Sequence, residues 1–200
     1  EAPADWGLEV RVGDTWAKSQ PPTAKRLAIE GLPAYRLFHG TLEGLTPGAP
    51  FSYRVIRKGK VEFESAAKAR KPAGQPQKFV VFGDSGSGTA DQLPLAHQVF
   101  LEKPDYLVIT GDIVYMRGRV SEYLANHFPV YNNDKASPTT GAPLLRSILS
   151  IAAAGNHDLI DRDLDRIPDG LAFFYYWDLP RNGPLRTPGA LHSATLQGSP

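Results

Sequence analysis

The chain has 200 residues, of which 42% are hydrophobic and none is cysteine, and its 22 basic and 21 acidic residues leave a formal net charge of +1. This charge balance gives no support for nucleic-acid binding, which needs a basic surface to neutralise phosphates. No stretch approaches the roughly 20 apolar residues of a membrane span. The lack of cysteine excludes disulfides, thiolate metal ligands and cysteine nucleophiles.

Residues 1–72 are predicted to form a small β-sandwich, because short segments of strand-forming residues alternate with Gly and Pro turns. These segments span residues 8–12, 25–31, 35–45 and 51–69. Gly59 in "IRKGK" fits the tip of a hairpin, where a tight turn needs a positive backbone angle. The passage "LTPGAPFSY" is similar to the strand-to-strand corner of a fibronectin type III domain, with Leu45 entering the core and Phe51 or Tyr53 anchoring the corner. Another kind of small β-sandwich is the alternative.

A second domain is predicted over residues 78–200, after a linker at 73–77 that is rich in Pro, Gly and polar residues. Continuous apolar runs alternate there with segments of helical spacing, which predicts an α/β domain with a parallel sheet buried on both faces. The apolar runs lie in 78–86, 104–115 and 143–158, and the helical segments are 89–103 and 119–128.

Each of the three apolar runs ends in a polar cluster. The clusters are Asp84 in "GDSG", Asp112 and Tyr115 in "GDIVY", and Asn156, His157 and Asp158 in "GNHD". Because parallel strands end at the same edge of a sheet, and ligands bind beyond that edge, these side chains are expected to converge. Anionic oxygens that converge repel one another unless a cation lies between them. Oxygen donors suit hard metal ions, a phenolate suits ferric iron, and a carboxylate can bridge the two metals found in many phosphatases.

The three motifs, in this order and at these spacings, resemble the first three motifs of the calcineurin-like metallophosphoesterases. Two details resemble the purple acid phosphatase branch: Gly86 stands where many members have a metal-binding histidine, and Tyr115 follows Asp112 by three residues. A fibronectin-like domain before the catalytic domain is also typical of that branch. The resemblance implies a four-layer α/β/β/α sandwich, of which this chain would carry the N-terminal half.

The resemblance also implies a binuclear centre of Fe³⁺ with Fe²⁺, Zn²⁺ or Mn²⁺. Asp84 and Tyr115 would bind the ferric ion, Asp112 would bridge both ions, and Asn156 would bind the divalent ion through its amide oxygen. His157 would hydrogen-bond the substrate phosphate and protonate the leaving group, and Asp158 would orient His157. The implied reaction is hydrolysis of a small phosphomonoester by a secreted or periplasmic enzyme.

The chain departs from the family pattern because three further histidine ligands of the family have no counterpart in it. His192 lies outside any Gly-His-x-His motif and is not expected to bind metal, and His39, His97 and His127 are expected to face solvent rather than a metal. We therefore expect this chain to be the front part of a longer protein.

Two other functions stay open. One is a phosphodiesterase or nucleotidase on the same scaffold, since a fold alone does not choose the substrate. The other is a binding protein with an incomplete metal site. The aromatic stretch at residues 171–184 is predicted to be a β segment packed under the sheet, with a wall of the substrate cleft as the alternative.

Overall fold

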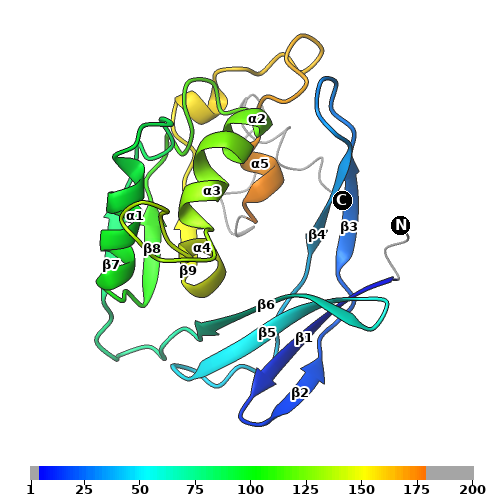
Figure 1. The fold of residues 1–200 in the computed structure, drawn as a ribbon, viewed down its shortest axis with the longest axis vertical. Coiled ribbons are helices and arrows are strands. Elements are labelled where there is room, and N and C mark those ends of the chain that lie inside the picture. The colour runs from blue at the N-terminus through cyan, green and yellow to red at the C-terminus, as the bar shows by residue number, and fades with distance from the viewer. Residues whose placement is uncertain (1–4, 179–200) are drawn as a thin grey trace, which may run out of the picture.

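The N-terminal part of the chain consists of antiparallel strands in the computed structural model, which describes residues 5–178 (Figure 1). Four strands form one sheet in the order β2-β1-β5-β6. They are β1 (Trp6–Val12), β2 (Thr15–Lys18), β5 (Pro50–Arg57) and β6 (Lys60–Lys68). β3 (Thr23–Leu27) and β4 (Tyr35–His39) pair as a second sheet. These strands agree with a β-rich N-terminal region, whereas its fibronectin type III identity and the domain limits at 72 and 78 stay predictions.

The hairpin between β5 and β6 turns at Lys58 and Gly59, whose φ angles are 49° and 80°. Two successive positive φ angles are typical of the tight turn that matches the twist of antiparallel strands. The hairpin tip expected at Gly59 is therefore confirmed.

Tyr53, one of two residues expected to anchor a corner of the β-sandwich, instead connects two parts of the chain. Its hydroxyl donates a hydrogen bond to the carbonyl of Arg146 at 2.8 Å. Arg146 belongs to α4 (Leu144–Ser147), and its guanidinium lies 5.1 Å from the ring centre of Phe63 on β6. This pairing attaches the four-stranded sheet to the helical layer that follows.

The C-terminal part contains a parallel sheet in the order β7-β8-β9, as the apolar runs predict. The strands are β7 (Phe79–Phe82), β8 (Tyr106–Ile109) and β9 (Leu149–Ala152). Their last residues, Phe82, Ile109 and Ala152, pair across the sheet in register. All three motifs therefore start from the same edge of this sheet.

Helices cover one face of the parallel sheet (Figure 1). Leu107 and Ile109 of β8 are fully buried beneath them. The helical segments are α1 (Gln92–Leu101), α2 (Val120–Glu122), a π-helical turn η2 (Tyr123–His127) and α3 (Phe128–Tyr131). Both helices expected from the sequence are thus confirmed. Within residues 5–178, the helices are too short or too polar to cross a membrane.

The opposite face of the parallel sheet carries apolar side chains that stay about half exposed. Phe79 and Val81 on β7 are each 51% exposed, and Leu149 and Ile151 on β9 are 44% and 50% exposed. The described residues thus form one sheet and one helical layer of the expected four-layer sandwich, and its other two layers are not among them.

The aromatic stretch expected as a β segment begins instead with a helical turn, α5 (Phe173–Tyr176). Phe173 is 1% exposed and packs in one core with Leu27 at the end of β3. A helical turn lets Phe173 enter this core while Tyr176, three residues later, reaches the hydroxyl of Tyr35 at 2.5 Å. Packing against the N-terminal strands therefore overrides the strand preference of the aromatic residues. Residues 179–184 lie outside the described residues.

Candidate functional site

The turns of the first two motifs hydrogen-bond to each other. The backbone N–H of Asp84 donates to the carbonyl of Gly111, and that of Ser85 donates to the carbonyl of Asp112, both at 3.2 Å. Asp84 and Asp112 have φ angles of 52° and 48°, in the left-handed region that costs a side-chain-bearing residue roughly 1–2 kcal/mol. Strain of this kind on two aspartates at adjacent strand ends indicates a functional site.

Tyr115 brings the two carboxylates together. Its hydroxyl donates hydrogen bonds to Oδ1 of Asp84 and, at 3.2 Å, to Oδ2 of Asp112. The hydrogen bond to Asp84 is the main cause that raises the pKa of the Tyr115 hydroxyl, and burial and the charges of both carboxylates add to it. A cation among these three oxygens would instead lower the pKa of the Tyr115 hydroxyl, because a positive charge favours the phenolate.

Gly86 leaves no room for a side chain. A Cβ atom at this position would lie 2.1 Å from the carbonyl oxygen of Ile113. The Gly86 carbonyl also accepts the backbone N–H of Tyr115 at 3.0 Å. The close approach that excludes a histidine at position 86 therefore also positions the loop that carries Tyr115.

The third motif is attached to the second through Asp112. The backbone N–H of His157 donates to Oδ1 of Asp112 at 2.9 Å. A Cβ atom on Gly155 would lie 2.1 Å from this same oxygen, so only glycine allows the approach. The rings of His157 and Tyr115 then lie with their centres 4.5 Å apart. Four of the six predicted site residues thus form one connected group: Asp84, Asp112, Tyr115 and His157.

Asn156 follows β9 at the same edge and precedes the short 3₁₀ turn η3 (His157–Leu159). Its side chain is exposed and makes no capping hydrogen bond, while its carbonyl accepts the N–H of Leu159 at 3.2 Å. The amide is therefore available to a ligand. Its role as a metal ligand, like the roles of the other site residues, stays a prediction.

His157 is oriented by a backbone carbonyl. Its Nδ1 lies 2.8 Å from the carbonyl oxygen of Met116. Because a carbonyl only accepts hydrogen bonds, Nδ1 carries a proton, and Nε2 is the nitrogen left for a substrate.

Glu122 fixes the loop that supplies this carbonyl, and the sequence analysis missed it. Its carboxylate accepts the backbone N–H groups of Met116 at 2.6 Å, Arg117 at 3.1 Å and Arg119 at 2.9 Å. The available signal was a glutamate three residues after the N-cap residue Arg119, which is the spacing of a capping box. That pattern predicts a cap and says nothing of the histidine that the capped loop orients.

Asp158 was expected to orient His157, but the structure gives its carboxylate other partners. Oδ2 accepts the backbone N–H of Gly155 at 2.8 Å, and Oδ1 accepts that of Ile113 at 3.2 Å. The side chain is fully buried, and this desolvation raises the pKa of the Asp158 carboxyl against the opposing effect of these hydrogen bonds. Asp158 thus joins the backbones of the second and third motifs, and Met116 makes the contact to the ring.

His127 was expected to face solvent and is instead fully buried. It lies among aromatic rings, with ring centres 5.4 Å from Tyr123 and 5.0 Å from Tyr131, and neither of its nitrogens has a hydrogen-bond partner among the described residues. Burial lowers the pKa of the His127 imidazole to about 3. His39 is exposed and His97 half-buried, whereas His192 lies outside the described residues.

The donor set fits one hard cation. Oxygens of Asp84, Asp112 and Tyr115 converge within hydrogen-bonding distance, and carboxylate and phenol oxygens suit such an ion. Between residues 5 and 178, no group of three or more His, Cys, Asp or Glu side chains is arranged to hold a metal. A second ion would therefore have Asp112 and Asn156 as its described donors.

Comparison with known proteins gives one family. The sequence model of the calcineurin-like phosphoesterases matches residues 77–195. No curated protein matches. Among solved structures, one described as the structure of PhoD is similar, with 15% sequence identity and a TM-score of 0.41. The similarity covers 78% of this chain and 33% of that one, so this chain spans about a third of the PhoD chain.

Proposed function

The chain belongs to the calcineurin-like phosphoesterase family, and from this membership we propose that it hydrolyses phosphomonoesters in the manner of purple acid phosphatases. The proposed cofactor is Fe³⁺ paired with Fe²⁺, Zn²⁺ or Mn²⁺. The observation that carries the proposal is the contact of the Tyr115 hydroxyl with the carboxylates of both Asp84 and Asp112. The closed space at Gly86 supports it, because a tyrosine then takes part where a histidine has no room.

Asp84, Tyr115 and Asp112 would hold the ferric ion, and Asp112 with Asn156 would hold the divalent ion. A metal pair of this kind neutralises the phosphate and lowers the pKa of bound water, so that a hydroxide is available for in-line attack. The chain contributes two further features: Gly155 lets the third motif approach Asp112 closely, and the N–H of His157 keeps the Asp112 carboxylate in position.

His157 would act at the leaving group. With Nδ1 engaged by the Met116 carbonyl, Nε2 is left to hydrogen-bond a phosphate oxygen. In its protonated form, Nε2 can donate its proton to the departing alkoxide, which is general acid catalysis. The Met116 carbonyl can accept the Nδ1–H of the ring before and after this transfer, so the hydrogen bond keeps the orientation of His157 throughout the step.

The proposal is tested by the metal content and colour of the aerobically purified protein. We expect iron and a second metal near one each per chain, with a visible absorption band from charge transfer between phenolate and iron. Tyr115→Phe should remove the band and lower the iron content. Tyr106→Phe is the matched control, because Tyr106 lies on β8 with its ring stacked on Phe79. Stoichiometric metal with an unchanged band in Tyr115→Phe would refute the role of Tyr115.

The bridging role of Asp112 is tested by Asp112→Asn. Replacing a bridging carboxylate with an amide should lower the content of both metals and the hydrolysis of 4-nitrophenyl phosphate together. Retained metal or retained activity would contradict bridging. A wild-type chain without stoichiometric metal and without hydrolysis would instead identify the chain as a binding protein with an incomplete metal site.

A further inference from the structure

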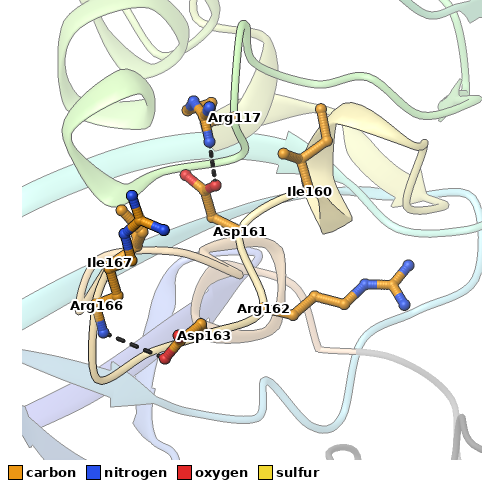
Figure 2. A pocket seen from close by; sticks show the side chains of 7 residues that line it. All are labelled: Arg117, Ile160, Asp161, Arg162, Asp163, Arg166 and Ile167. Atoms are coloured by element: carbon orange, nitrogen blue, oxygen red, sulfur yellow. Dashed lines mark hydrogen bonds and ion pairs between the residues drawn. The ribbon is translucent and has the colours of Figure 1, made fainter.

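We propose that the cavity lined by Arg117, Arg162 and Arg166 binds a second anionic group on the leaving group of the substrate. This inference rests on the proposed phosphomonoesterase function and narrows its substrate class. The cavity has a volume of about 360 Å³, and Ile160 and Ile167 add apolar surface to its lining. Figure 2 shows the ion pair of Arg117 with Asp161 at this cavity.

The cavity is built from the two loops that hold the catalytic imidazole. Arg117 follows Met116, whose carbonyl accepts the hydrogen bond from His157 Nδ1 at 2.8 Å. Asp161 follows His157 by four residues, and it pairs with Arg117 across the same two loops. The imidazole and the cavity are therefore carried by the same two loops, and this shared support is the observation that links the anion site to the leaving group.

The positive charge of the cavity is not fully compensated. Three guanidinium groups and the carboxylates of Asp161 and Asp163 line it. Arg117 neutralises Asp161, and Asp163 accepts only the backbone N–H of Arg166, at 3.3 Å. Arg162 donates its Nε–H to the carbonyl of Leu159 at 2.8 Å. In the part of the chain that the structure describes, the guanidinium groups of Arg162 and Arg166 have no ion-pair partner, so they can bind a carboxylate or phosphate through paired N–H donors.

Asp161 anchors Arg117 from a buried position. The residue is only 6% exposed, and its Oδ2 is buried without a hydrogen-bond partner among residues 5–178. A buried carboxylate oxygen normally has a donor. A ligand in the cavity does not reach this buried oxygen, so Asp161 fixes the position of Arg117, and the substrate class is a phosphomonoester whose leaving group bears an anionic group.

A matched pair of substrates tests this class, because 2-phosphoglycerate and glycerol 2-phosphate differ only by a carboxylate in place of a hydroxymethyl group. We expect kcat/KM to favour 2-phosphoglycerate by roughly 10-fold, as a charge-assisted contact allows. Combined Arg162→Ala and Arg166→Ala substitution should abolish this preference by lowering kcat/KM for 2-phosphoglycerate. Arg70→Ala changes an exposed arginine between β6 and β7, and this control variant should keep the preference for 2-phosphoglycerate. Equal ratios in wild type and double variant would overturn the proposal.

A binding measurement separates this inference from the proposed function. Inorganic pyrophosphate is titrated calorimetrically into protein freed of metal with EDTA. Binding that the double variant loses and Arg70→Ala keeps supports the anion site, even if neither ester is hydrolysed and the phosphatase proposal fails. No binding by the wild type, or equal binding by the double variant, refutes the anion site whatever the activity.

Discussion

Glu122 and His157 are linked through the peptide of Met116: the Glu122 carboxylate accepts the Met116 N–H at 2.6 Å, and the Met116 carbonyl accepts the His157 Nδ1–H at 2.8 Å. The Glu122 carboxylate does not contact the imidazole. It sets the direction of the Met116 carbonyl, and this carbonyl orients the imidazole. Glu122 is a positioning residue, and substrate would contact His157.

Removal of the Glu122 carboxylate should therefore impair the proton transfer more than substrate binding. We expect Glu122→Ala to lower kcat by about 10-fold or more while KM changes little, because general acid catalysis contributes 10²–10⁴-fold and depends on geometry. Glu122→Gln keeps an oxygen acceptor and should restore part of kcat. Steady-state kinetics on esters with poor and good leaving groups is the measurement. Equal losses for both groups of esters would contradict the proposed link to His157.

Asp158→Asn should affect stability rather than the chemical step. The amide keeps one acceptor oxygen but turns an NH₂ group toward backbone donors, which leaves a buried N–H unsatisfied at a cost of about 1–3 kcal/mol. Urea unfolding measures the change, and kcat per bound metal should stay near the wild-type value. A large fall in kcat without loss of stability would instead support direct orientation of His157 by Asp158.

Gly155→Ala should separate the third motif from the second. The added Cβ would lie 2.1 Å from Asp112 Oδ1 and 2.3 Å from its backbone nitrogen. The resulting shift should lower stability by about 1–3 kcal/mol, as overpacking does, and reduce metal content. Gly7→Ala on β1 is the control, because its Cβ would approach nothing closer than 3.9 Å. Similar metal content in the two variants would contradict the tight contact at Asp112.

His127 should make the fold sensitive to acid. Its pKa is about 3 in the folded chain and about 6.5 when unfolded. The unfolded state therefore binds the proton first, and stability is lost as the pH falls from about 6.5 toward 3, by at most about 1.4 kcal/mol per pH unit. Well above pH 7 the imidazole is neutral in both the folded and the unfolded state, and His127 no longer makes the stability depend on pH.

His127→Phe removes this titration and two buried nitrogens that have no hydrogen-bond partner within residues 5–178. Thermal unfolding between pH 4 and 8 should show a smaller loss of stability at low pH than in the wild type, and stability near pH 8 equal to or above it. His39→Gln changes an exposed histidine and serves as the control. An unchanged pH profile in His127→Phe would contradict the role of His127.

Much of the site could be predicted because it depends on local patterns. Apolar runs of strand length predicted the three parallel strands, and strands that run in one direction bring Asp84, Asp112 and the third motif to one edge. The close approach of these turns in the structure explains why positions 86, 111 and 155 are glycine. The same three motifs also predicted the family, and the family model that matches residues 77–195 confirms it.

Tertiary structure alone decided the contacts between these turns. Whether a carboxylate meets an imidazole or a backbone N–H depends on how loops about 40 residues apart cross, and no residue pattern within one loop records this crossing. Asp158 therefore turned inward, the Met116 carbonyl took the place expected for it, and Glu122 gained a role beyond that of a cap. His127 and Phe173 became core residues for the same reason, because burial is set by the segments that pack against a helix rather than by the helix itself.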